Sequence, residues 1–366
     1  EIRVVQRSAE QDALWTVCQE TMARRRPQLV ELTGPRGVGR SRLTSDLLYR
    51  LEEGGWAEGV RMDFGAGGGP GLGLRGCWRR LLPSGGKPEK RVAEVARFIA
   101  RNRRQSPDRC EPDARALLAW LEPSSDLPHA DSRIARTLLV EHLVARSWRG
   151  MVWLCLEDLH LAPENDNCWA VLDAVLAAKA PILVLSTTAA GHHSPSILEL
   201  RLRNPKDQHQ IPMKPLEASA ASGLVQALLS LDLSLERRLV AYTRGTPGRI
   251  RDIVLHWVHA GSLHESQAPG EGRRIWSLRD ERHFPKNEQH FAELRLAHLQ
   301  DEGPANAALD AIALAGNGCP HEVIERIAGE GLDRLRVEGL VELRGSCLHL
   351  VPPELVDVVA KQIATE

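Results

Sequence analysis

The chain has 366 residues, and its 47 Lys and Arg against 48 Asp and Glu give a formal net charge of −1. With 43% hydrophobic and 26% charged residues, it has the composition of a globular protein of two or three domains, without the basic excess of a nucleic-acid coat protein. No apolar run approaches the roughly 18 residues of a membrane helix, and the seven cysteines never form a Cys-x-x-Cys pair. These features argue against a membrane protein, a disulfide scaffold and a zinc site, and they favour a reducing, cytoplasmic location.

The N-terminal part of the chain alternates helices with short apolar strands. Its predicted elements are a helix over 9–26, a strand over 28–33, a helix over 43–54 and a strand over 60–64. A glycine-rich loop at 65–73 and a long helical stretch at 74–149 follow. We expect this stretch to break at 83–86, 106–110 and 123–128.

Two further apolar runs, 151–156 and 181–188, flank a helix over 169–178 and end in polar residues. A weak fifth strand lies at 211–213. Continuous apolar strands that alternate with helices predict a parallel sheet covered by helices on both faces. The predicted fold class is therefore α/β.

The chain after Pro215 is predicted to be helical, with helices over 218–229, 235–243 and 249–259. A polar segment rich in Gly and Pro, 266–287, is interpreted as a linker. The last part is predicted to hold helices near 305–315, 321–328 and 332–338, followed by a hairpin of strands 340–343 and 347–351. Three helices and a hairpin are typical of a winged helix.

The segment Gly34–Ser41 has the spacing of a phosphate-binding loop, GxxxxG followed by a basic residue and Ser. Glycines allow backbone N–H groups to turn towards a phosphate, and the following helix presents its positive N-terminus. Ser41 would be a ligand of Mg²⁺ on the β-phosphate. Arg40 stands where lysine is usual, and its planar fork does not replace an ammonium freely.

Two acids, Glu157 and Asp158, end an apolar strand about 120 residues after this loop. In ATPases of this build, one acid at this position holds Mg²⁺ and the other polarises the attacking water. The alternative interpretation is that both acids are solvated residues of a turn. The presence of the phosphate loop in the same chain makes this alternative less favoured.

These segments, in this order, resemble the P-loop ATPase modules of the STAND and AAA types found in bacterial regulatory and signalling proteins. The resemblance includes residues 4–10 as an entry motif over the adenine, residues 153–162 as a Walker B segment, and Gly245–Pro247 as the GxP element of a helical lid. It implies a P-loop NTPase fold of the ASCE type with sheet order 5-1-4-3-2, an all-helical lid and a C-terminal winged helix. The implied domains are a nucleotide-binding domain at 1–214, a lid at 215–265, a linker and helix at 266–301, and a winged helix at 302–366.

The resemblance also implies ATP or ADP with Mg²⁺ as cofactors, and it assigns roles to residues of this chain. Asp158 would be the general base and Glu157 a catalytic residue, with Ser41 and Glu157 as metal ligands, and Thr187 or Thr188 would act as the sensor. The nucleotide would be bound by Gly34, Gly37, Val38, Gly39, Arg40, Ser41, Arg42, Thr187, Pro247 and Arg249. For Arg249, a solvated arginine in a first helical turn is the simpler interpretation.

Four departures from the family pattern affect the hydrolytic elements. Arg40 replaces lysine, Glu157 replaces aspartate, Pro163 replaces an acid, and Ala189 stands where arginine usually follows the fourth strand. Each substitution alone is compatible with ATP hydrolysis. Together they predict an ATPase that turns over slowly, if at all.

Two charge features bear on the partner. Residues 74–104 hold ten basic residues against two acids, which is usually a solvated helix face and otherwise a docking surface for an acidic partner or nucleic acid. Residues 302–366 hold eleven acids and five bases, and such a balance opposes phosphate contact by the winged helix. We therefore expect a protein partner and no membrane, with nucleic acid disfavoured but not excluded. The resemblance also allows nucleotide-dependent self-association.

Three functional hypotheses remain from the sequence. The favoured one is a nucleotide-dependent regulatory switch. The second is a pseudo-ATPase scaffold of the same fold that does not hydrolyse ATP. The third is a DNA-associated ATPase of the initiator or transposition-helper type, which the basic run supports and the acidic winged helix opposes.

Overall fold

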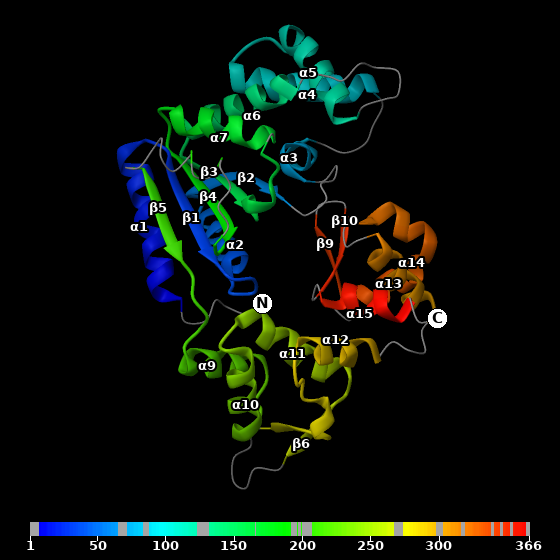
Figure 1. Ribbon diagram of the computed structural model, residues 1–366. Helices are drawn as coiled ribbons and strands as arrows, with labels where there is room; N and C mark the ends of the chain where they lie inside the picture. Colours follow the sequence, from blue (N-terminus) through cyan, green and yellow to red (C-terminus); the bar gives the residue numbers. More distant parts are fainter. Residues whose placement is uncertain are drawn as a thin grey trace. The chain divides into compact units, whose positions relative to one another are not determined.

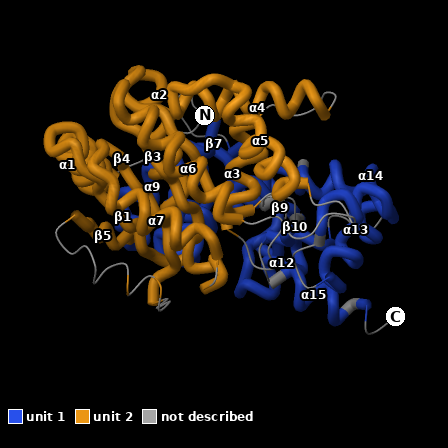
Figure 2. Tube along the Cα trace, turned by 90° about the horizontal axis from the view of Figure 1, so that it is seen from above, with its two compact units in different colours: residues 1–6, 36–39, 214–366 blue, residues 7–35, 40–213 orange. Residues whose placement is uncertain are grey.

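The computed structural model describes residues 7–64, 72–82, 88–122, 132–164, 166–191, 196, 199, 207–266, 274–297, 303–315, 319–337, 340–344, 347–351 and 354–363. The chain divides into two compact units (Figure 2). The sheet unit contains residues 7–35 and 40–213, and the C-terminal unit contains residues 36–39 together with the chain from Lys214 onward.

A five-stranded parallel sheet forms the centre of the sheet unit (Figure 1). Its strand order, β2-β3-β4-β1-β5, is the expected order 5-1-4-3-2 read from the opposite edge, so the predicted α/β fold class is confirmed. The strands are β1 (Gln28–Gly34), β2 (Ala57–Asp63), β3 (Met151–Glu157), β4 (Ile182–Ala189) and β5 (Gln208–Pro212). Strands β3 and β4 are buried along almost their whole length, as the continuous apolar runs predict.

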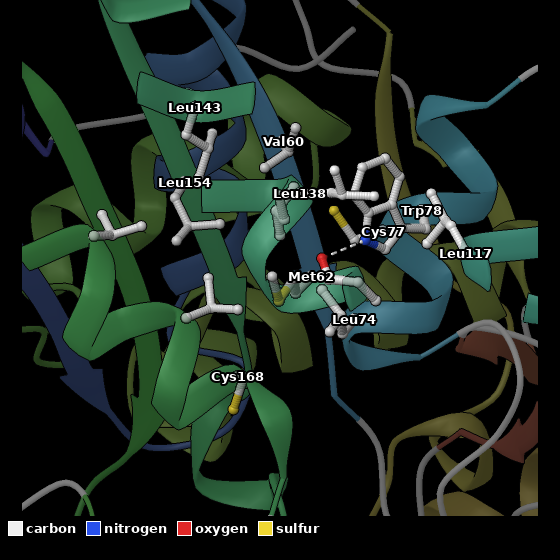
Figure 3. Packing of buried hydrophobic residues seen from close by; sticks show 14 of the residues in the cluster. Val60, Met62, Leu74, Cys77, Trp78, Leu117, Leu138, Leu143, Leu154 and Cys168 are labelled. Carbon is white, nitrogen blue, oxygen red and sulfur yellow. Dashed lines mark hydrogen bonds between the residues drawn. The ribbon is translucent and has the colours of Figure 1, made fainter. Parts of the chain in front are cut away.

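Helices cover both faces of this sheet, with α1 and α2 on one face and α3 to α7 on the other (Figure 1). They are α1 (Ser8–Arg24), α2 (Arg40–Glu53), α3 (Gly73–Leu81), α4 (Pro88–Arg103), α5 (Pro107–Leu121), α6 (Ser132–Ser147) and α7 (Asn167–Ala177), with a 3-10 turn η1 (Leu159–Leu161) after β3. The α3–α7 side holds a continuous hydrophobic core. Trp78 is fully buried there beside Cys77 and Leu138, and its Nε1 donates to the Ala135 carbonyl at 3.0 Å (Figure 3).

Two boundaries in the sheet unit differ from the sequence prediction. Strand β2 begins at Ala57, because Ala57–Asp63 pairs along its length with β3. The expected break at 106–110 is wrong beyond Ser106, since Ser106 is the N-cap of α5 and Pro107 occupies the first turn. Most of the glycine-rich loop predicted at 65–73 lies outside the described residues.

The C-terminal unit begins with the lid helices α9 (Ala218–Leu228), α10 (Leu233–Thr243) and α11 (Pro247–His259), close to their predicted bounds. Strand β7 (Ile275–Leu278) pairs with β6 (Leu263–Ser266) and lies in the segment 266–287 interpreted as a linker, which corrects that interpretation for residues 275–278. The Trp276 side chain in β7 packs against the core of the lid helices, and its backbone N–H donates to the Ser230 carbonyl. A 3-10 turn, η2 (Glu281–His283), and α12 (Glu288–Ala297) follow.

The last part combines helices with a small antiparallel sheet, in the helix–helix–hairpin order of a winged helix. Its elements are α13 (Gly303–Leu314), β8 (Cys319–Pro320), α14 (His321–Val337), β9 (Val341–Arg344), β10 (Cys347–Leu350) and α15 (Glu354–Ile363). The two predicted helices at 321–338 appear as α14 with a non-helical residue at Ala328. Helix α15 was not predicted, although its Leu355 and Val359 are buried in the core of this part. In the described part of the chain, no helix is long and apolar enough to cross a membrane.

Candidate functional site

The predicted phosphate loop joins the end of β1 to the start of α2, with Gly34 as the last strand residue and Arg40 as the first helical residue. Gly37 and Gly39 have φ angles of +75° and +101°, which side chains other than glycine rarely adopt. Val38 between them is buried. This turn leads into the N-terminus of a 14-residue helix, where unpaired backbone N–H groups and the helix dipole attract anions.

Arg40 does not point out of the loop into solvent, because its side chain is only 9% exposed. Its Nη1 donates to the Gly34 carbonyl at 2.9 Å and to the Thr188 carbonyl, and its Nη2 lies 3.4 Å from Oδ1 of Asp158. Burial lowers the pKa of the guanidinium, while Asp158 and Glu157 raise it in part. Arginine still carries its charge at neutral pH, so these contacts are charge-assisted.

Glu157, the last residue of β3, accepts two hydrogen bonds on Oε2. Ser41 Oγ donates at 2.8 Å, and Thr187 Oγ1 of β4 donates at 2.9 Å. The carboxylate is 7% exposed, and Arg61 Nη2 lies 3.6 Å from its Oε1. Three of the predicted site residues therefore meet at the carboxyl ends of β3 and β4.

Asp158 follows β3 in a left-handed conformation, with φ of 52°, which is uncommon for a residue other than glycine. Its backbone N–H donates to Thr187 Oγ1 at 2.8 Å, so that Thr187 links the two acids. Its carboxylate remains partly exposed and forms the ion pair with Arg40. The structure thus brings both acids, both loop residues 40 and 41, and Thr187 into one hydrogen-bonded group.

The other predicted residues lie elsewhere. Arg42 is exposed on α2, and Thr188, the alternative sensor, donates to the buried carboxylate of Glu31 at 2.7 Å. Within the C-terminal unit, Pro247 begins α11, and Arg249 forms an ion pair with Glu288 of α12 at 2.9 Å.

The same unit contains a close backbone contact between the loop and the start of α11. The Gly248 N–H donates to the Gly37 carbonyl at 2.8 Å. A Cβ added to Gly248 would lie 2.9 Å from the Gly37 Cα, so no side chain fits at Gly248 without a backbone shift.

Two contributors were missed by the sequence reasoning. Arg61 lies in β2 opposite Cys155 and reaches both Glu157 and Ser45 Oγ, which it contacts at 2.9 Å. Glu31 is 5% exposed in strand β1, which lies between β4 and β5. An arginine and a glutamate inside predicted strands are the signals that could have identified both, since buried charges require partners.

The oxygen atoms of this group suit a hard cation. Ser41 Oγ and Glu157 Oε2 are 2.8 Å apart, and one hydroxyl and one carboxylate next to a phosphate loop are the protein ligands that Mg²⁺ commonly has beside a nucleotide. Among the described residues, no group of three or more His, Cys, Asp or Glu is arranged to hold a metal by itself.

No protein-family model matches this chain, and no curated protein matches its sequence. Among solved structures, ORC1 of Aeropyrum pernix in complex with DNA is 14% identical, with a TM-score of 0.48, over 100% of this chain and 95% of that one. Cdc6p of Pyrobaculum aerophilum is 15% identical, with a TM-score of 0.45, over 100% and 96%. Aeropyrum pernix ORC2, solved as ADPNP and ADP complexes, is 12% identical, with a TM-score of 0.42, over the same shares. At this level of likeness, nothing about ligands or activity transfers to the present chain.

Proposed function

We propose that this chain binds ATP or ADP with Mg²⁺ at Gly34–Ser41 and acts as a nucleotide-dependent regulatory switch of the STAND or AAA type, with slow or absent hydrolysis. The observation that carries the proposal is the turn between β1 and α2, in which two glycines with positive φ precede a helix N-terminus. The Glu157 carboxylate within 2.8 Å of Ser41 Oγ supports it. The signal would be passed to a protein partner, and self-association would depend on the bound nucleotide.

The roles follow from the contacts. Backbone N–H groups of the loop would bind the phosphates, and Ser41 and Glu157 would hold Mg²⁺, which neutralises phosphate charge when bound. Asp158 would act as general base and Thr187 as the sensor, because Thr187 contacts both acids. Pro247 and Arg249 would contribute from the lid.

Calorimetry with Mg·ATP and Mg·ADP tests this proposal. We expect micromolar affinity, a binding free energy of about −8 kcal/mol. Gly39→Ala should abolish binding, because alanine is strained at φ of +101° and redirects the loop N–H groups. Gly55→Ala is the matched control, since Gly55 also has positive φ, with open space around it, at the far end of α2.

Equal nucleotide affinity of both glycine variants and the wild type would contradict a site at this loop. Absence of binding by the wild type at millimolar Mg·ATP would contradict the proposed function as a whole.

Steady-state phosphate release separates the switch from the pseudo-ATPase scaffold. With Arg40 engaged by strand-end carbonyls and by Asp158, we expect turnover well below the roughly 1–100 s⁻¹ of competent phosphoryl-transfer enzymes. A rate inside that range would show that the four departures do not impair hydrolysis. A rate at the background of the assay, with nucleotide bound, favours the scaffold.

One observation favours the third hypothesis, a DNA-associated ATPase. Lys90, Arg97 and Arg101 are exposed on α4, and their spacing places them along one side of the helix. A gel shift with random duplex DNA tests it, because phosphate contacts make binding weaken steeply between about 50 and 200 mM salt. Loss of the shift in a variant with all three residues replaced by alanine would support this surface as the contact.

A further inference from the structure

Arg40 contacts the ends of three neighbouring strands. Its guanidinium donates to the carbonyl of Gly34 at the end of β1 and to the carbonyl of Thr188 at the end of β4, and it pairs with Asp158 directly after β3. These strands are adjacent in the order β3-β4-β1. One side chain therefore spans the sheet edge where the loop begins.

The guanidinium is suited to this arrangement because of its shape. Nη1 donates to the carbonyls of Gly34 and Thr188, and Nη2 donates to the carboxylate of Asp158. The planar guanidinium holds both nitrogens in fixed directions. A lysine at this position has a single nitrogen on a flexible stem. Lysine would keep the positive charge but not the three contacts together.

The contacts fix both sides of the predicted site. Gly34 is the first residue of the loop, and its carbonyl also accepts from the Ala190 N–H at 3.1 Å. Asp158 is held in its left-handed conformation by its own N–H on Thr187 and by the ion pair with Arg40. The positions of the loop and of the acid are thus coupled through one buried cation.

We propose that Arg40 is a positioning residue that ties the phosphate loop and Asp158 to the sheet edge, and that it is not a phosphate ligand. The proposal rests on the proposed function in so far as the loop is taken to bind nucleotide. The loop would then hold the phosphates through its backbone N–H groups, and the Arg40 guanidinium would contact only protein groups.

The first experiment uses the full chain without nucleotide. Arg40→Ala and Arg40→Lys should both lower the melting temperature, by about 5 °C or more for alanine, since charge-assisted contacts to buried groups are lost. Hydrogen exchange should become faster at residues 34–39 and 187–190. Arg101→Ala, which removes an exposed arginine of α4, is the control and should leave both measurements unchanged.

A double-mutant cycle with Arg40→Lys and Asp158→Asn tests the coupling between the two side chains. Both substitutions are conservative, so the variants are expected to fold. We expect the two losses of melting temperature to be less than additive, since each variant weakens the same contact between residues 40 and 158. Additive losses, or a nucleotide-free protein that is insensitive to Arg40→Lys, would overturn the proposal.

The second experiment measures nucleotide affinity. A positioning role predicts that Arg40→Lys weakens ATP and ADP by the same factor, because the loop itself is displaced. A direct contact to the terminal phosphate predicts that ATP is weakened selectively while the nucleotide-free melting temperature stays unchanged, and this outcome contradicts the proposal. If the wild type binds no nucleotide, the proposed function fails, and the nucleotide-free experiments still decide the role of Arg40.

Discussion

His142 of α6 is a histidine that the fold keeps neutral. It is 3% exposed, its ring packs on Phe98 with centroids 4.7 Å apart, and its Nδ1 lies 3.3 Å from Oδ1 of Asn102. Burial and, to a smaller extent, the positive charge of Arg146 lower the pKa of His142 to about 4, although Glu58 opposes the shift. The protonated form is therefore much less stable in the folded protein than in the unfolded chain.

The sign of the resulting pH dependence follows from this depression. In the unfolded chain the pKa of histidine is about 6.5, so the unfolded state takes up a proton first as the pH falls. Above pH 6.5, His142 should leave the free energy of unfolding unchanged. By pH 4 it should lower the free energy of unfolding by about 3 kcal/mol. Denaturant melts from pH 7 to pH 4 should show this slope in the wild type, a reduced slope in His142→Gln, and an unchanged one in the exposed His264→Gln.

A substitution at Gly248 should also affect stability, because its Cα packs directly against the Gly37 backbone. Gly248→Ala should lower the melting temperature by a few degrees, roughly 1–3 kcal/mol of overpacking, and should weaken nucleotide binding. Gly329→Ala in α14 is the control, since a Cβ there meets only Glu325 Cγ at 3.9 Å. Equal behaviour of the two variants would show that the Gly37 contact is dispensable.

At the scale of elements, α4 explains what happens to the basic run at residues 74–104. Acids later in the sequence, which the local count does not include, neutralise part of it. Arg91 pairs with Glu122, and Arg103 bridges Asp113 of α5 and Glu141 of α6. Some of the basic residues at 74–104 therefore form ion pairs within the protein and are not available to dock a partner.

Arg103→Ala should therefore destabilise the packing of α4, α5 and α6. We expect a loss of about 1 kcal/mol, a modest value because both acids are about one-third exposed. The melting temperature should fall by roughly 2–4 °C, while Arg101→Ala on the same helix should have no effect. An equal effect of both variants would mean that the bridge contributes nothing beyond net charge.

The elements that the sequence predicted well are those with a strong period. Strands β3 and β4 are continuous apolar runs, and the lid helices repeat apolar residues at helical spacing. Strand β7 has only four residues, all half-buried, so neither alternation nor an apolar run marks it. Helix α15 follows a hairpin, and its amphipathic period spans only ten residues.

For the candidate site, the motif spacing identified the residues but not their contacts. The grouping of Ser41, Glu157 and Thr187 follows from parallel strands whose carboxyl ends meet at one edge. The direction of Arg40 could not be predicted, because its acceptors are backbone carbonyls of residues six and 148 positions away. Sequence patterns carry no information about carbonyl groups.

At the scale of the whole chain, α12 belongs to two cores of the C-terminal unit. Phe291 is buried with the lid helices and lies edge-on to His256 of α11, with ring centroids 5.7 Å apart. Ala292 and Leu296 are buried with α13, α14 and α15. One short helix therefore connects the lid to the C-terminal helices.

Removing residues 303–366 should accordingly affect the remaining protein. Ala292 and Leu296 would become exposed, and we expect a lower melting temperature, increased binding of a hydrophobic dye and reduced solubility. A truncated protein that stays monomeric with an unchanged melting curve would show that the C-terminal helices are independent of the lid.

The contact between Gly37 and Gly248 has an evolutionary consequence. Gly37 is constrained by its φ of +75°, whereas Gly248 is constrained by the Gly37 backbone, because a Cβ at position 248 would lie 2.9 Å from the Gly37 Cα. In descendants that no longer use the loop, selection on Gly37 would relax first, and any shift of its backbone would free Gly248 to vary. Among homologues, a side chain at position 248 should thus mark lineages in which the loop has lost its glycines, and the two positions should covary although they lie 211 positions apart in the sequence.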